Sequence, residues 1–291
     1  MPAREITIEL PHLTLAAQCW GDETLPPLLA LHGWLDNAAS FNALAPLLAS
    51  RFQVVAIDLP GHGRSAHRPA GGWYHYVEYL ADIQAAVQAL GWQRYSLLGH
   101  SLGGAAASIF AAAQPESVQT LLLIESLGPL TAAPEAALEQ LRRGMSQRAT
   151  FNTKLLRVFP DASIAVRARM QANDLSEAAA SALVERGLAA VPGGWSWSSD
   201  PRLTLASPLR YTEAQIQTIL RGIQAPTLVV LAQPETSYLP AALMQARAAC
   251  VADVTLHYLP GNHHLHLENA APVAAAMLAF CDRIASSEAV G

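Results

Sequence analysis

The chain has 291 residues, of which 52% are hydrophobic and 14% are charged, and its formal net charge at pH 7 is −5. This composition supports a large buried core, and the excess of acidic over basic residues argues against nucleic acid as a partner. No apolar run approaches the ~18 residues of a membrane span, and the N-terminal stretch lacks the basic-then-apolar order of a signal peptide. We therefore expect a cytoplasmic protein without membrane insertion, and the composition leaves its oligomeric state open.

Two N-terminal segments alternate apolar and polar residues as half-exposed antiparallel strands do, EITIEL and LTLAAQCW. Six nearly continuous apolar runs follow, of the kind found in strands buried on both faces of a parallel sheet: PLLALHG, QVVAIDLPG, YSLLGHS, TLLLIES, PTLVVLA and VTLHYLPG. Helical patterns lie between or after them, over 76–91 with Gly91 as a C-cap, from 102 to Pro115, and over 271–287. The alternation of strand and helix predicts an open α/β sheet.

Residues 127–223 break this alternation, because they contain no convincing strand pattern. Short helices are expected there instead, over 133–147, 149–159, 162–172, 176–191 and 212–223. We therefore expect one core, formed by residues 1–126 and 224–291, with an all-helical cap of residues 127–223 inserted into it.

The sequence GHSLG places Ser101 between an apolar strand and a helix, in a G-x-S-x-G frame. In that frame the serine lies on a strained strand-to-helix turn that exposes its hydroxyl above the sheet, as a nucleophile requires. The N–H of Leu102 can then face a developing oxyanion, and the N–H of Trp34, after the turn at His32 and Gly33, is the expected second donor. The alternative is a plain buried strand followed by a helix.

Three motifs in this order, HGW, DLPGHGRS and GHSLGG, resemble the α/β-hydrolase superfamily, and the insertion lies where the capped branch carries its cap. More narrowly, HGWLDNAASFNALAPLL, SLLGHSLGG, WSSDPRL and GNHHLH resemble the serine hydrolase-like proteins. The resemblance covers the whole core. It implies an α/β-hydrolase fold, with a mostly parallel open sheet flanked by helices, and a hydrolase activity without a firmly implied substrate.

A serine nucleophile needs a base, because its hydroxyl is protonated at neutral pH. The tract YLPGNHHLHLENAAPV provides three histidines after the last strand. The resembled superfamily usually has its catalytic histidine five residues before a glutamate that opens the final helix, which here points from Glu268 to His263. His264 remains the alternative, and His266 is expected to pack or hydrogen-bond at the start of the helix.

The carboxylate that would orient the histidine has two possible positions. Most relatives have an aspartate after the strand TLVVLA, but this sequence has Thr236 there, with Glu235 beside it. The other position used in the fold is the end of the strand before the insertion, where Glu125 follows an apolar run. A carboxylate at the end of a buried strand is costly without a partner, so Glu125 is preferred and Glu235 is the alternative.

Other polar residues are expected to have structural roles. Asp58 should brace its loop, and Asp36 should cap the next helix, with Ser40 as the competing cap. The three cysteines lie far apart without a CxxC spacing, so we expect reduced thiols. The sequence has neither a metal-binding histidine motif nor a glycine-rich nucleotide loop, so we expect no metal and no cofactor.

These observations predict a serine hydrolase, similar to carboxylesterases, that cleaves an ester or related acyl bond of a small to medium apolar substrate through an acyl-enzyme. Four side chains are expected to contact this small-molecule substrate: His100, Trp34, Trp195 and Trp197. Tryptophans within the insertion can equally form its own small core. The alternatives are hydrolysis of a C–C bond or thioester by the same residues, or a hydrolase scaffold that binds a ligand or partner without catalysis.

Overall fold

The computed structural model describes residues 3–151 and 157–288. Its main sheet has eight strands: β1 Arg4–Glu9, β2 Thr14–Trp20, β3 Pro27–Leu31, β4 Gln53–Ile57, β5 Tyr95–His100, β6 Val118–Ile124, β9 Thr227–Gln233 and β10 Val254–Pro260. They lie in the order β1-β2-β4-β3-β5-β6-β9-β10. The pairs β1–β2 and β2–β4 are antiparallel and the remaining pairs are parallel. The predicted open α/β sheet is therefore confirmed.

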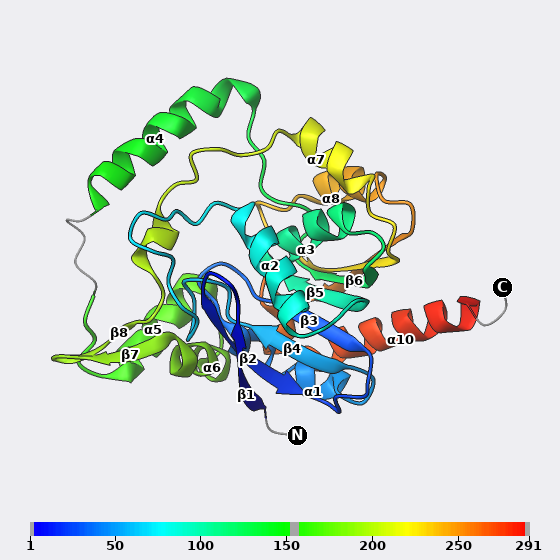
Figure 1. Ribbon diagram of the computed structural model, residues 1–291, viewed down its shortest axis with the longest axis horizontal. Helices are drawn as coiled ribbons and strands as arrows, with labels where there is room; N and C mark the ends of the chain where they lie inside the picture. Colours follow the sequence, from blue (N-terminus) through cyan, green and yellow to red (C-terminus); the bar gives the residue numbers. More distant parts are fainter. Residues whose placement is uncertain (1–2, 152–156, 289–291) are drawn as a thin grey trace.

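Helices cover both faces of this sheet (Figure 1). One face packs against α2 Glu78–Ala89, α3 Leu102–Ala113, α7 Glu213–Leu220 and α8 Ala241–Ala248. The other packs against the 3-10 helix η1 Ala38–Phe41, α1 Ala45–Leu48, α9 Leu265–Glu268 and α10 Ala270–Glu288. Successive strand residues point to opposite faces, so in β3 Leu29 and Leu31 join one core while Leu28 and Ala30 join the other. This explains the unbroken apolar runs.

The segment 127–223, named the insertion from here on, lies between β6 and β9. It contains the 3-10 helices η2 Pro134–Ala136 and η4 Pro201–Thr204, the helices α4 Ala137–Ala149, α5 Ala162–Asn173, α6 Glu177–Gly187 and α7, and the strands β7 Leu188–Val191 and β8 Gly194–Trp197. In Figure 1 these elements, apart from α7, lie on the side of the sheet away from the C-terminal end of α10. The helix expected over 149–159 falls partly on 152–156, outside the described residues.

Two expectations about the insertion are wrong. It is not all-helical, because β7 and β8 pair as an antiparallel hairpin. Gly193, in the turn between these strands, has φ 88°, and Gly194, the first residue of β8, has φ 141°, backbone values that favour glycine and suit a hairpin. In addition, α7 was expected in the cap, whereas its Ile216 and Leu220 belong to the main core cluster beside α3.

An ion pair and hydrogen bonds attach the insertion to the core. Nε of Arg186 in α6 lies 3.0 Å from both carboxylate oxygens of Asp58, and the side-chain amide of Asn37 donates to the Leu183 carbonyl at 2.8 Å. Asp58 also accepts the N–H groups of Ala38 at 2.7 Å and Arg64 at 2.8 Å. The predicted bracing role of Asp58 is therefore confirmed, and it extends to holding the insertion.

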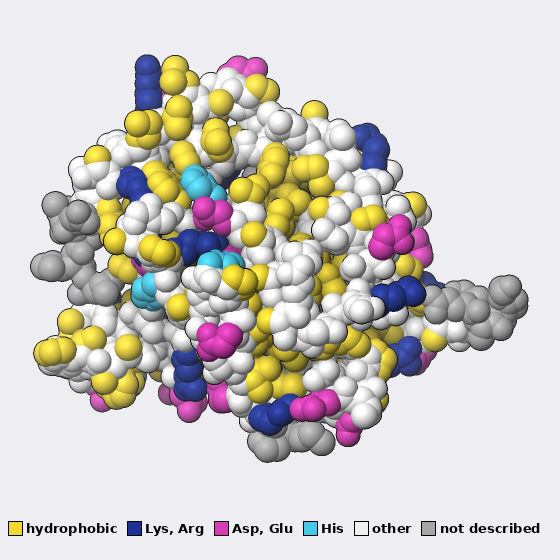
Figure 2. Space-filling view, viewed as in Figure 1, with side chains coloured by type: hydrophobic (Ala, Val, Ile, Leu, Met, Phe, Trp, Pro, Cys, Tyr) yellow, Lys and Arg dark blue, Asp and Glu magenta, His cyan; other side chains and the backbone are white. Residues whose placement is uncertain are grey.

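The surface in Figure 2 shows basic side chains scattered among acidic and apolar ones. Among the described residues, no helix combines the length and apolar character needed to cross a bilayer. All three cysteines are free thiols, with Cys19 and Cys281 buried.

Two fully buried histidines predict acid-sensitive stability. Burial lowers the pKa of His32 to about 4 and that of His62 to about 3, whereas an unfolded histidine is protonated below about pH 6.5. The unfolded chain then binds more protons, so stability should fall as the pH falls from 6.5 towards 4, by about 1 kcal/mol per pH unit for each histidine. We expect thermal melts followed by circular dichroism to show a clearly lower melting temperature at pH 5 than at pH 7.

The control compares two single variants. His62→Gln should reduce this pH dependence, while Ser146→Ala, at an exposed position that does not titrate, should leave it unchanged. A melting temperature that is the same at both pH values would contradict the burial of neutral imidazoles.

Candidate active site

Ser101 lies on the sharp turn between the end of β5 and the start of α3. Its backbone has φ 50° and ψ −113°, a conformation that L-residues rarely adopt and that costs about 1–3 kcal/mol. Glycines let neighbouring backbone approach this turn: a Cβ on Gly103 would lie 2.1 Å from the Leu31 carbonyl oxygen, and one on Gly99 would lie 2.4 Å from the Gly104 Cα. Close packing therefore requires both glycines of the G-x-S-x-G frame.

The first turn of α3 lies directly against the loop after β3. Gly103 donates its N–H to the His32 carbonyl at 3.0 Å, which joins the two segments. Leu102 is the first residue of α3, so its own N–H has no acceptor within the helix. The N–H of Leu102 is therefore available beside Ser101 at the positive end of the helix.

His32 braces the loop after β3. The Leu59 N–H donates to Nε2 of His32 at 2.9 Å, so Nδ1 carries the proton and donates to the Gly33 carbonyl at 2.7 Å. Burial lowers the pKa of His32 to about 4, which keeps the imidazole neutral and this tautomer in place. The Asp36 N–H donates to the same carbonyl at 3.1 Å and closes the turn that contains Trp34.

Glu125 and His263 meet at the carboxyl edge of the sheet. Glu125 follows β6 with φ 51°, and its side chain is 2% exposed. Its Oε1 accepts the Ala232 N–H at 2.5 Å, and its Oε2 lies 3.1 Å from Nδ1 of His263. Nδ1–H of His263 can therefore donate to the carboxylate, which leaves Nε2 free to accept a proton.

The alternative acid lies elsewhere. Glu235 is on an exposed loop, and its carboxylate accepts the N–H of Ala241 at the start of α8. At the position where most members of the resembled superfamily have an aspartate, the Thr236 hydroxyl lies 3.5 Å from Oε2 of Glu125. Thr236 therefore supports the carboxylate that contacts His263.

The surroundings of His263 favour its neutral form. Burial lowers the pKa of His263, and Glu125 acts in the opposite direction. Its ring centroid lies 4.8 Å from that of His100 and 5.2 Å from that of Tyr238. His100 was expected to contact substrate; it is 1% exposed, and its Nε2 lies 2.8 Å from the His263 carbonyl oxygen.

The other two histidines of the C-terminal tract point to different partners. His264 is 4% exposed, and its Nε2 lies 3.4 Å from Oδ2 of Asp36. The His264 N–H donates to the Asn262 side chain at 2.9 Å. His266 is fully buried, with Nε2 2.8 Å from the Ser40 hydroxyl, which agrees with a packing and hydrogen-bonding role.

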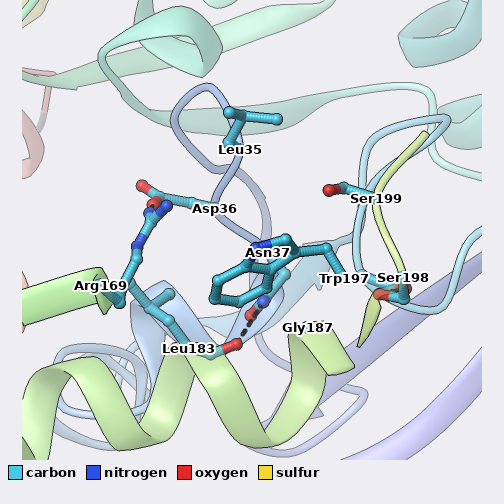
Figure 3. Close-up of a pocket in the computed structure, with 10 residues that line it drawn as sticks. Leu35, Asp36, Asn37, Arg169, Leu183, Gly187, Trp197, Ser198 and Ser199 are labelled. Atoms are coloured by element: carbon cyan, nitrogen blue, oxygen red, sulfur yellow. Dashed lines mark hydrogen bonds and ion pairs between the residues drawn. The ribbon is translucent and has the colours of Figure 1, made fainter. Parts of the chain in front are cut away.

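The expectation that Asp36 caps the next helix is wrong. Asn37 caps η1 instead, because its side chain accepts the Ala39 N–H at 3.1 Å. Asp36 is 3% exposed and forms an ion pair with Arg169 of α5, as Figure 3 shows. The sequence carries one signal for this role, a charged residue shortly after the apolar run PLLAL, which a buried partner explains better than an exposed cap does.

Asp36, His100 and His264 could also be considered as metal ligands. Among the described residues, one ligand atom from each of these three lies within 4.8 Å of the other two. The guanidinium of Arg169 already faces the Asp36 carboxylate and compensates its charge. This arrangement fits an internal ion pair better than it fits a cation.

The tryptophans have different surroundings. Trp34 is 53% exposed, and its indole N–H donates to the Leu203 carbonyl of the insertion at 3.0 Å. Trp195 is 40% exposed on β8. Trp197 packs edge-on against Phe159 with ring centroids 5.4 Å apart, as part of a small cluster within the insertion, and also lines the small cavity in Figure 3.

The sequence and the fold of this chain resemble those of known proteins. A family model described as alpha/beta hydrolase fold matches residues 26–270. A serine hydrolase-like protein of Danio rerio is 33% identical over 287 residues, which cover 96% of this chain and 88% of that protein. This similarity confirms the resemblance inferred from the motifs.

Two solved structures extend the comparison. A hypothetical protein from Pseudomonas aeruginosa PAO1 is 40% identical with a TM-score of 0.90, covering 96% of this chain and 99% of that one. The thioesterase domain from the curacin biosynthetic pathway is 29% identical with a TM-score of 0.86, covering 96% of this chain and all of that one (100%). These similarities support a hydrolytic function, and the chain belongs to the alpha/beta hydrolase fold family.

Proposed function

We propose that this protein is a serine hydrolase that cleaves esters or related acyl bonds. The observation that carries the proposal is the 3.1 Å contact between Oε2 of Glu125 and Nδ1 of His263, at the sheet edge where Ser101 holds a strained turn. In this proposal Ser101 attacks the carbonyl carbon. His263 takes the hydroxyl proton and then delivers it to the leaving group, while Glu125 keeps the imidazole in the required tautomer.

The developing charge needs hydrogen-bond donors. We assign the N–H groups of Leu102 and Trp34 to the oxyanion, since Gly103 joins their two segments through the His32 carbonyl. The acyl group is then held on the Ser101 oxygen until water, deprotonated by His263, releases the acid. No cofactor is required by this sequence of steps.

The substrate is proposed to be small to medium and apolar. Two aromatic side chains beside the proposed catalytic residues are accessible: Trp34 is 53% exposed and Tyr238 is 46% exposed. Tyr238 packs edge-on against the ring of His263. Accessible aromatic surface at these positions favours an acyl group with hydrocarbon character.

A thioester is the second candidate substrate. The supporting observation is the similarity to the thioesterase domain of the curacin pathway, at 29% identity and a TM-score of 0.86. The same attack, acyl-enzyme and release apply, with a thiolate as the leaving group. Oxygen esters and thioesters of matched acyl length would rank the two by kcat/KM.

A covalent probe tests the nucleophile. Wild-type protein should be labelled by a fluorophosphonate at pH 7.5, and Ser101→Ala and His263→Ala should lose the label, because one lacks the nucleophile and the other its base. In-gel fluorescence measures the labelling. Ser146→Ala, on the exposed face of α4, serves as the control and should label as wild type does. Absence of labelling in folded wild-type protein would instead favour a binding role without catalysis.

Two isosteric variants test the acid. Glu125→Gln should lower kcat for a p-nitrophenyl ester by about 10³- to 10⁴-fold, because the imidazole loses the partner that fixes its tautomer. Glu235→Gln, the matched control, should stay within about threefold of wild type. A large loss in Glu235→Gln with a normal rate in Glu125→Gln would show that the acid is misassigned.

The pH dependence follows from the burial of His263. Because burial lowers the pKa of this base from its usual 6.5, the acid limb of kcat/KM should have its midpoint below pH 6.5, with a plateau at neutral pH. Initial rates between pH 4.5 and 8, read at the isosbestic wavelength of p-nitrophenol, measure the limb. A midpoint above pH 6.5 would contradict the statement that burial outweighs Glu125 at His263.

A further inference from the structure

We infer that Asp36 is a positioning residue for the proposed reaction, whose carboxylate links Arg169 of the insertion to the loops that carry Ser101, His263 and Trp34. The inference rests on the proposed function. It assigns a role to a residue that touches neither the serine nor the glutamate of the proposed catalytic set.

The carboxylate of Asp36 lies where these loops meet. Its Oδ1 forms the ion pair with Arg169 of α5, which approaches from the insertion (Figure 3). Its Oδ2 lies 3.5 Å from Nδ1 of His100 and 3.4 Å from Nε2 of His264. His100 directly precedes Ser101 along the chain, and His264 directly follows His263.

Two backbone contacts complete the link. The Asp36 N–H closes the turn that contains Trp34 by donating to the Gly33 carbonyl at 3.1 Å. His100 reaches the base loop directly, because its Nε2 lies 2.8 Å from the His263 carbonyl oxygen. One carboxylate therefore touches, directly or through one imidazole, the segments carrying the proposed nucleophile, base and oxyanion donor.

The space around the carboxylate is tightly limited. A Cβ on Gly33 would lie 2.8 Å from both Oδ2 of Asp36 and Nδ1 of His100. Asp36 and His100 are 3% and 1% exposed. If the Asp36 carboxylate moves, Gly33 and His100 must therefore move with it, because a closely packed interior transmits displacement.

The charge of Asp36 gives the role a specific signature. Nε2 of neutral His100 carries the proton that faces the His263 carbonyl, so Nδ1 packs against Asp36 without donating to it. Burial opposes ionisation of the Asp36 carboxyl, but His264 and Arg169 outweigh it and hold the pKa of Asp36 well below its usual value. The resulting negative charge, together with Glu125, acts to raise the pKa of His263 against burial and His100. Tyr238 and His264 also face the His263 ring. Removing the charge of Asp36 should therefore lower the pKa of His263.

The principal test replaces the charge at nearly constant volume. Asp36→Asn should lower kcat for a p-nitrophenyl ester by about tenfold or more with KM changed by less than about threefold, since positioning affects the chemical step more than binding. The acid limb of kcat/KM should move to lower pH. NMR titration of the His263 ring in the same variant should give a lower pKa, and this readout needs no turnover.

Arg169→Gln tests the link to the insertion and remains decisive if Asp36→Asn fails to fold. It should lower kcat less than Asp36→Asn does, and the double variant should be no slower than Asp36→Asn, because both changes act through one carboxylate. Wild-type kcat and KM in Arg169→Gln would overturn the link from the insertion.

Asp58→Asn is the matched control, since Asp58 is another buried core carboxylate paired with an arginine of the insertion. It should lower the melting temperature yet leave the His263 pKa unchanged. The inference is overturned if Asp36→Asn keeps the wild-type kcat and His263 pKa, or if Asp58→Asn shifts that pKa equally. Absence of Ser101-dependent hydrolysis in wild-type protein would instead refute the proposed function, and the inference with it.

Discussion

Carboxylates buried at the carboxyl edge of the sheet set the constraint on which the site depends. A charge removed from water is strongly destabilising unless a partner compensates it with good geometry. Three such carboxylates follow three parallel strands, and a side chain from a distant segment meets each one: Glu125 meets His263, Asp36 meets Arg169, and Asp58 meets Arg186. Because each carboxylate is paired in this way, the loop after β10 and the insertion both lie at the carboxyl edge of the sheet. The need to pair buried carboxylates thus accounts for both the assembly of the site and the position of the insertion.

Neutral histidines complete this arrangement. Burial lowers the pKa of His32, His100 and His266, so these rings are present as neutral hydrogen-bonding groups rather than as cations. His32 shows the consequence most clearly, because it accepts the Leu59 N–H of the loop after β4 and donates to the Gly33 carbonyl of the loop after β3. A histidine-rich edge can in this way hold backbone loops in place without adding positive charge next to the base.

Local patterns predicted the sheet because its strands are buried on both faces, which leaves continuous apolar runs. They also predicted the turn at Ser101, because Gly99 and Gly103 occupy positions where a side chain would collide with neighbouring backbone. The same approach missed the hairpin β7–β8. Its strands are short and only partly buried, and the first of them directly follows α6, whose alanine-rich sequence favours a helix. It also placed α7 with the cap, because a helix pattern reports an apolar face without reporting which core that face joins.

The sequence by itself determined the alternation of strands and helices, the strained serine turn and the short list of bases and acids, because each is encoded by residues close together in the chain. Tertiary structure alone decided which histidine meets which carboxylate. His263 and His264 are adjacent, yet one lies against Glu125 and the other against Asp36, since the loop after β10 turns their side chains towards different strands. The partners of Asp36 are separated from it by 64 to 228 positions along the chain, so only folding could bring them to one carboxylate.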